Sequence, residues 1–304
     1  MDELRSVKVT TLADNFVQES GVLGQWGLSL LLDIEDARGT MHKVIFDTGA
    51  VKEGLLYNIE KLKANLSDLE YIVLSHGHGD HTATTVELLK KAKRGVKVVA
   101  HPHLYLPKFS LTREGKRRAG GLPKGERLED IRRVGGQLIT TEESFELLPG
   151  ACTTGEIPRV THFETVSPPP SGGKRLTVID GKAVPDLILD DQAIVMNLKK
   201  IGPIVITGCA HSGIINTLRQ AQRISSFEKI YGVIGGFHLI QRRDEYINRT
   251  VKELKNFRLQ LLSPCHCTGF KATSMIYRAF PKAFVLNFSG RVIRTDRKTE
   301  PRIV

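Results

Sequence analysis

The segment Ser-His-Gly-His-Gly-Asp-His, at residues 75–81, constrains this chain more than any other stretch. It directly follows Tyr-Ile-Val-Leu, a β-branched and aromatic run that predicts a buried strand, so the histidines lie on the loop that leaves the strand. Imidazole is the commonest metal ligand, and carboxylates suit harder divalent ions. We therefore predict that His76 and His78 face one metal ion and that Asp80 and His81 face a second. The alternative, a polar loop with incidental histidines, is disfavoured because three of the chain's ten histidines lie here.

The order His-x-His-x-Asp-His after a strand resembles the metal-binding motif of the metallo-β-lactamase superfamily. The resemblance implies an α/β (α+β) fold, the αββα sandwich, with a mononuclear or dinuclear metal site at one edge of its two sheets. It also implies a metal-activated water as the usual nucleophile. Because the superfamily hosts many chemistries, the motif predicts the fold and the metal but not the substrate.

Length and composition are those of an ordinary globular protein, with 304 residues, 40% hydrophobic and 25% charged, and we expect one domain over residues 1–304. No apolar stretch reaches the ~18 residues of a membrane span, and the first residues lack the basic-then-apolar order of a secretory signal. Four cysteines form no disulfide framework, which predicts a cytoplasmic protein. The formal net charge of +11 favours anionic partners, unless it only reflects a solvated surface.

Further ligand candidates lie at the ends of later predicted strands. The strand over residues 203–206 runs into Thr-Gly-Cys-Ala-His, which places Cys209 where much of the superfamily carries a bridging aspartate. We predict His211 as a ligand, and Cys209 either as a ligand or as a small buried apolar residue. By resemblance, His266 at the end of the strand over residues 259–264 is the superfamily's last ligand. A structural zinc site is not expected there, since Cys-His-Cys lacks a second ligand pair.

Four carboxylates are predicted to lie close to the metal. Asp47 belongs to an Asp-Thr-Gly turn that, in the superfamily, supports the metal loop by hydrogen bonds rather than by binding metal. Glu156, Asp190 and Asp191 lie in the elements Gly-Glu-Ile-Pro-Arg and Asp-Asp-Gln-Ala and are candidates either for metal ligands or for such supports.

Three residues are predicted to act on the substrate. Asp80 would serve as the base on the attacking water if only one ion binds. His238 follows a glycine turn, and a catalytic or substrate-facing role suits it better than metal ligation. Arg159 is the candidate to contact a substrate phosphate.

Two segments are expected to be insertions outside the core. Residues 108–133, within an insertion at about residues 104–135, hold nine Lys/Arg against four acidic residues and are punctuated by glycines, which predicts a mobile segment near the site. Its arginines could clamp a phosphate, or the segment could be a solvated surface; few aromatic residues interleave it, so nucleic acid is disfavoured. A Pro- and Gly-rich stretch predicts a loop at about residues 166–186, and residues 284–289 are expected to form the last core strand.

Together these short motifs span nearly the whole chain and resemble one branch of the superfamily. That branch is commonly labelled 7,8-dihydropterin-6-methyl-4-(β-D-ribofuranosyl)aminobenzene-5′-phosphate synthase. The resemblance implies a metal site beside a pocket suited to small phosphorylated, pterin-like substrates. It implies no oligomeric state.

Three hypotheses about function follow. The first is a metal-dependent phosphoester hydrolase with two divalent ions, Mn²⁺ or Zn²⁺, with a third ion left open by the nearby carboxylates. The second is the synthase, in which an aromatic amine displaces diphosphate from a pterin. The third is a non-catalytic metal-binding sensor, which the intact histidine motif disfavours. The predicted ligands are His76, His78 and His211 for one ion and Asp80, His81 and His266 for the other.

Overall fold

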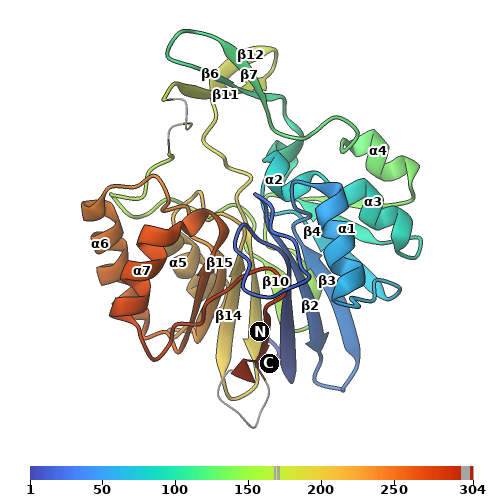
Figure 1. Cartoon of the computed structure of the whole chain (residues 1–304), viewed down its shortest axis with the longest axis vertical. Coiled ribbons are helices and arrows are strands. Elements are labelled where there is room, and N and C mark those ends of the chain that lie inside the picture. The colour runs from blue at the N-terminus through green and yellow to red at the C-terminus, as the bar shows by residue number, and fades with distance from the viewer. Residues whose placement is uncertain (168, 170–171, 296–301, 304) are drawn as a thin grey trace.

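The chain folds as a sandwich of two β-sheets between two layers of helices, with a small third sheet above one end (Figure 1). The structure is a computed structural model and describes residues 1–167, 169, 172–295 and 302–303. The αββα architecture predicted from the histidine motif is confirmed.

The first sheet holds the metal loop and is antiparallel in one half and parallel in the other. Parallel strands place their carboxyl ends at a common edge, where ligands of α/β proteins bind. In spatial order its strands are β18 (Arg302–Ile303), β17 (Val292–Thr295), β1 (Ser6–Ala13), β2 (Ser29–Glu35), β3 (Met41–Phe46), β4 (Leu69–Val73), β5 (Lys97–Ala100) and β8 (Gln137–Thr140).

The second sheet carries the remaining histidines. Three of its strands run parallel, which again collects their carboxyl ends at one edge. In spatial order its strands are β16 (Leu261–Cys265), β15 (Gly232–Gly236), β14 (Gly202–Thr207), β13 (Ala193–Leu198), β10 (Ala151–Thr153) and β9 (Glu146–Leu148).

Alternation along the strands decides which layer each side chain enters. In β2, Leu30 and Leu32 point between the two sheets and share a core with Ile206 of β14. Leu31 points the other way, into a second core with Leu55 of the covering helix layer. Successive strand residues face opposite sides, and each buried leucine contributes about 1.5–3 kcal/mol, so the apolar strands form both interfaces at once.

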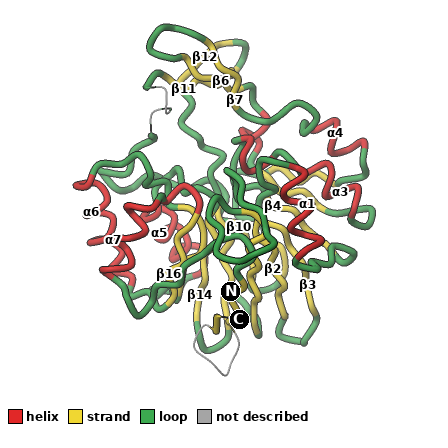
Figure 2. Tube along the Cα trace, viewed as in Figure 1, coloured by secondary structure: helices red, strands yellow, loops and turns green. Residues whose placement is uncertain are grey.

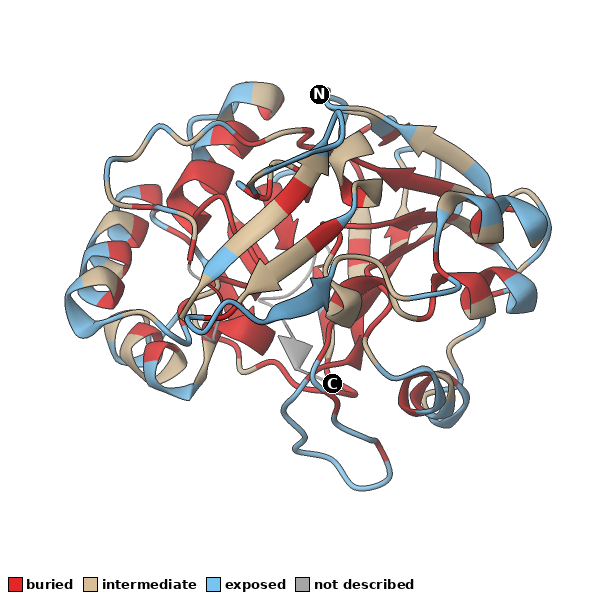
Figure 3. Ribbon diagram, turned by 90° about the horizontal axis from the view of Figure 1, so that it is seen from above, coloured by how far each residue is buried: buried red, intermediate tan, exposed pale blue. Residues whose placement is uncertain are grey.

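Helices cover the outer face of each sheet (Figure 2), and buried residues gather between the sheets and beneath the helices (Figure 3). Among the described residues, no helix combines the length and apolarity needed to cross a bilayer. On the first sheet lie α1 (Lys52–Lys61), α3 (Thr85–Lys91) and α4 (Leu128–Arg133); on the second lie α5 (Ile214–Ser225), α6 (Asp244–Leu254) and α7 (Phe270–Ala279); the short helices are α2 (Gly79–Thr82), η1 (Pro102–Tyr105), η2 (Lys255–Phe257) and η3 (His266–Thr268).

The third sheet corrects the expectation that residues 166–186 form a loop, and it gives the basic segment two strands. Two strands come from the basic segment and two from the segment predicted as a loop, and β6 pairs antiparallel with β11. Local sequence could not predict this pairing, because the paired residues of β6 and β11 lie 63 to 69 positions apart in the chain. Residues 168, 170 and 171 of the Pro-rich stretch lie outside the described residues. The strands are β12 (Lys182–Pro185), β11 (Lys174–Ile179), β6 (Lys108–Leu111) and β7 (Arg117–Gly120).

The predicted last core strand, residues 284–289, is wrong. Only single bridges form there, at Phe284 and Ser289, and the strands nearest the C-terminus are β17 and β18. Hydrogen bonds from side chains to the backbone replace strand pairing here. The Asn287 Oδ1 accepts from the Phe288 N–H, and the Ser289 hydroxyl bonds both the N–H and the carbonyl of Asp14. The segment is therefore fixed to the loop after β1.

Glu126 joins the basic segment to the first turn of α3. Its carboxylate lies buried and accepts a 2.9 Å hydrogen bond from the Val86 N–H. Burial raises the pKa of the Glu126 carboxyl to about 7, against the lowering effect of that hydrogen bond.

This shift predicts a pH dependence of stability. Between the ordinary pKa of about 4.5 and the raised value of about 7, the folded chain holds a proton that the unfolded chain has lost, so the free energy of unfolding falls as pH rises. The Glu126→Gln variant keeps an acceptor for Val86 and should remove this component, whose slope is at most ~1.4 kcal/mol per pH unit. Urea unfolding from pH 4.5 to 8 measures it, with exposed Glu129→Gln as the matched control; equal slopes in all three proteins would contradict the assignment.

Candidate metal centre

Strand ends deliver the candidate ligands to one edge of the sandwich, below the third sheet (Figure 1). His76 and His78 follow β4, Cys209 and His211 follow β14, and His266 follows β16. Since β3–β4 and β14–β15–β16 are parallel sets, their carboxyl ends meet there, and the two halves of the chain face each other across the site.

His76, His78 and His211 form the first ligand group. The His76 Nε2 lies 2.9 Å from the His78 Nδ1, and the His211 Nε2 lies 3.2 Å and 3.1 Å from these two atoms. Three ligand nitrogens around a tetrahedral metal would lie about 3.3 Å apart, given ordinary metal–nitrogen bonds of about 2.0–2.1 Å. The spacing therefore fits one divalent ion.

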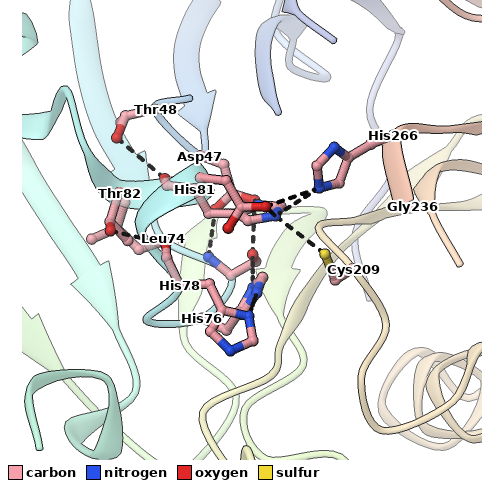
Figure 4. A network of polar contacts seen from close by, with 12 residues as sticks. Asp47, Thr48, Leu74, His76, His78, His81, Thr82, Cys209, Gly236 and His266 are labelled. Carbon is pink, nitrogen blue, oxygen red and sulfur yellow. Dashed lines mark hydrogen bonds and ion pairs between the residues drawn. The ribbon is translucent and has the colours of Figure 1, made fainter. Parts of the chain in front are cut away.

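Asp80, His81 and His266 form the second ligand group, and Figure 4 shows His81 and His266 facing each other. The His81 Nε2 and the His266 Nε2 lie 3.1 Å apart, and an Asp80 oxygen lies 3.8 Å and 3.5 Å from them. The other ring nitrogen of each histidine is engaged, since the His81 Nδ1 faces Asp47 at 2.6 Å and the His266 Nδ1 faces Asn15 Oδ1 at 2.9 Å. Such partners fix the tautomer that leaves Nε2 free for a metal.

Cys209 lies between the two groups. Its sulfur is 3.2 Å from the His81 Nε2, and it forms a compact set with His76 and His81. A further set joins Cys209 to His238 and Cys267, a residue that the sequence did not single out. In the sequence, Cys267 was noted only as the second cysteine of the Cys-His-Cys triplet. The turn of η3 brings its sulfur to the carbonyl of Cys209, just after β14.

Asp47 supports both groups without facing either as a ligand. Its two oxygens accept from the Ser75 N–H and hydroxyl, each at 2.7 Å, and one oxygen also bonds His81. The Ser75 hydroxyl in turn lies 2.8 Å from the His76 Nδ1. One carboxylate therefore orients a histidine of each group.

The other three predicted carboxylates lie outside the ligand groups found among the described residues. Asp190 is buried and accepts from the Gly77 N–H at 2.7 Å and from the Lys108 ammonium at 2.6 Å. Asp191 accepts from the Ser212 N–H at 2.8 Å, next to His211. Glu156 is partly exposed and faces His101 at 3.5 Å. The first two therefore brace the loops that carry the histidines.

The structure places Arg159 in a bracing position and puts a different arginine at the site. Arg159 donates to the carbonyls of Leu187 and Ile188, which holds that turn in place. Arg175 of β11 instead brings its Nη1 to 3.5 Å from the His78 Nε2, and it forms no ion pair with a carboxylate in the described part of the chain. Sequence reasoning missed it because its segment was expected to be a loop.

Burial sets the charge of the ligand histidines. It lowers the pKa of His76 and His211 well below the ordinary value, and that of His78 to about 3 with help from Arg175, so these rings are neutral and able to bind metal. For His81, burial also opposes the charge, but Asp47 and Asp80 outweigh it and raise the pKa to about 9. Metal binding to His81 therefore requires loss of its proton.

His238 lies beside the first group. Its ring centre is 4.1 Å from that of His211, and its buried Nδ1 has no hydrogen-bond partner among the described residues. Its backbone is left-handed, with φ 46°, as are those of Asp47, Ala210 and His266. Such conformations cost free energy in residues with a Cβ and gather at functional sites.

Comparison with known proteins agrees with this geometry. The sequence profile of the metallo-beta-lactamase superfamily matches residues 34–215, so the chain belongs to this superfamily. The superfamily predicted from the histidine motif is confirmed.

Two proteins of Methanocaldococcus jannaschii are similar over nearly the whole chain. One is described as 7,8-dihydropterin-6-methyl-4-(beta-D-ribofuranosyl)-aminobenzene-5'-phosphate synthase and is 32% identical over 290 residues, covering 95% of this chain and 97% of that protein. The other is an uncharacterized protein that is 30% identical over 285 residues, covering 94% and 99%.

Two solved structures share the fold. Tm1679, described as a metal-dependent hydrolase of the beta-lactamase superfamily, is 25% identical with a TM-score of 0.77, covering 95% of this chain and 99% of that one. YhfI from Bacillus subtilis, described as a metallo-beta-lactamase fold protein, is 14% identical with a TM-score of 0.53, covering 94% and 98%, and supports the fold alone.

Removal of one ligand should empty one group. We expect His76→Ala to lower the bound metal by roughly one ion per chain, because two neutral nitrogens remain where a tetrahedral site needs at least three protein ligands. Elemental analysis after loading with Zn²⁺ or Mn²⁺ measures this, with the exposed His162→Ala as the matched control. Unchanged metal content in His76→Ala would contradict the first ligand group.

The buried Lys108–Asp190 ion pair should couple the third sheet to the metal loop. Lys108→Met leaves Asp190 buried without its cation, which costs about 3–5 kcal/mol of stability. Asp190 also holds Gly77, so we expect metal affinity to fall about 10- to 100-fold. Denaturant unfolding and metal titration measure both effects against Lys116→Met, an exposed lysine of the same segment; two variants with equal stability and affinity would refute the coupling.

Proposed function

We propose that this chain is a metal-dependent synthase that joins a dihydropterin methyl diphosphate to an aromatic amine carrying a ribofuranosyl phosphate. The observation that carries this proposal is the 32% identity to the Methanocaldococcus synthase over 95% of this chain and 97% of that protein. Similarity confined to the histidine motif would favour only the superfamily, whereas this similarity includes the segments that surround the site.

The proposed reaction exchanges one bond for another. The C–O bond between the pterin methylene and the diphosphate breaks, and the diphosphate leaves with the bonding electrons. A C–N bond forms between the methylene and the amine, whose nitrogen loses a proton. The site must therefore hold a highly charged leaving group beside an aromatic amine.

The residues at the centre suit these demands. Divalent ions held by the two ligand groups would neutralise the diphosphate and orient it. Arg175 is partly buried and forms no ion pair with a carboxylate in the described part of the chain, so it suits the diphosphate oxygens, two of which one guanidinium can bind at once. His238 is the candidate to accept the amine proton, since its Nδ1 has no hydrogen-bond partner in the described structure; Asp80 would take this role only if its ligand group held no ion.

A second candidate function is a phosphoester hydrolase. Tm1679, which matches 95% of this chain at 25% identity, is described as a metal-dependent hydrolase. In this reaction a water replaces the amine as the nucleophile and a P–O bond breaks. The same ligand groups and Arg175 suit it, so the nucleophile distinguishes the two functions.

Separate and combined substrates decide between them. Protein loaded with Mn²⁺, Zn²⁺, Co²⁺ or Ni²⁺ is incubated with the pterin diphosphate, with the amine phosphate, and with both. We expect diphosphate release and a coupled product only from the pair, with activity lost in His76→Ala and kept in His162→Ala. Release without the amine, or turnover of simple phosphomonoesters or phosphodiesters, would favour the hydrolase. Metal binding without any turnover would reject both in favour of a non-catalytic sensor.

A further inference from the structure

A cavity of about 660 Å³ opens beside the second ligand group. It lies between α7, the loop that follows β1 and the segment 284–287, and His266 forms part of its wall. Ligand pockets of small molecules have volumes of about 300–1,000 Å³. We call this cavity the aromatic pocket.

Exposed aromatic side chains from separate segments surround the pocket. Phe16 is 42% exposed, Phe270 is 90% exposed and Tyr277 is 53% exposed, and all three line the cavity. Large apolar side chains rarely stay exposed together without a partner, and aromatic walls stack on flat rings. The lining therefore suits a planar aromatic ligand.

Buried hydrogen-bond donors line the same pocket without full partners. Asn287 is 2% exposed, and its oxygen accepts from the Thr11 hydroxyl at 2.7 Å, so its amide nitrogen is left with no neighbour better than the weakly accepting Cys265 thiol. Arg291 is 8% exposed as a residue; its guanidinium lies 5.1 Å from the centre of the Phe288 ring, and its buried Nε has no partner among the described residues.

Arg291 forms no ion pair in the described part of the chain, although Glu19 acts on it from a greater distance. A buried cation and a buried amide N–H without acceptors cost free energy that an acceptor on a ligand would recover.

The carboxylate and amide oxygens of Asp14 and Asn15, which also line the pocket, are already engaged. The Asp14 oxygens accept from the N–H groups of Phe16 and His266, each at 2.8 Å, and the Asn15 oxygen bonds the His266 ring. The pocket thus offers donors in excess. A pterin, which carries several N–H donors of its own, fits this lining less well than an aromatic amine with an anionic substituent.

We propose that the aromatic pocket binds an aromatic amine that carries an anionic group, with its ring among Phe16, Phe270 and Tyr277 and its anion at Asn287 and Arg291. The inference rests on the proposed function in one respect, since it assigns this pocket to the amine and leaves the diphosphate to the ligand groups and Arg175. It predicts a binding step that needs no metal.

Calorimetric titration of metal-free and metal-loaded protein with 4-aminobenzoate tests this step. We expect binding in both forms, weakened about 3- to 10-fold in Phe270→Ala and Tyr277→Ala and about 10- to 100-fold in Arg291→Gln. Phe270 and Tyr277 are exposed, so their variants should keep the fold even if the Arg291 variant does not. Tyr57→Ala, an exposed aromatic on α1, is the matched control and should bind as the wild type does. Aniline, which lacks the carboxylate, should bind more weakly.

Absence of 4-aminobenzoate binding, equal binding by the Phe270, Tyr277 and Tyr57 variants, or tighter binding of pterin-6-carboxylate in the same pocket would overturn the inference. Binding as expected, with no coupling of the amine to a pterin diphosphate, would keep the pocket and reject the synthase. Coupling activity unaffected by the pocket variants would keep the synthase and reject the pocket.

Discussion

The site depends on one buried carboxylate, that of Asp47, at the end of β3. Its oxygens accept hydrogen bonds from the N–H and hydroxyl of Ser75 and from the ring of His81. The Ser75 hydroxyl in turn hydrogen-bonds the His76 ring and holds it in place. The left-handed backbone of Asp47, with φ 62°, aims the side chain at these donors, and three hydrogen bonds offset its strain. Removal of this carboxylate would therefore loosen a histidine in each of the two ligand groups.

Close approach of the two sheets is the second requirement. Gly208, at the end of β14, lies so near the metal loop that an added Cβ would stand 2.1 Å from the Ser75 hydroxyl and 2.8 Å from an Asp47 oxygen. A side chain at this position would push β14 away from β4 and separate Cys209 and His211 from the histidines of the loop. The Thr-Gly-Cys order thus has a steric reason as well as a chemical one.

The sequence predicted those parts of the site that follow single strands. The metal loop was evident because histidines and a carboxylate crowd one short segment; His211 was predicted at a strand end, and His266 was predicted from the resemblance to the superfamily. Whether these residues bind metal stays a prediction, although the structure brings them within ligand distance of one another. Arg175 and Cys267 were not predicted, since their roles arise from contacts between segments far apart in the chain. For the same reason the local Pro- and Gly-rich pattern did not predict the third sheet.

The Cys209 sulfur, which lies between the two ligand groups, affects the conditions under which this centre can work. As a metal ligand, the Cys209 thiolate would select softer metals such as Zn²⁺ over the hard ions that carboxylates favour. Unlike a carboxylate, a thiol can also be oxidised, and its higher oxidation states are irreversible. A protein with this centre would therefore gain selectivity for soft metals and, in exchange, lose tolerance of oxidants.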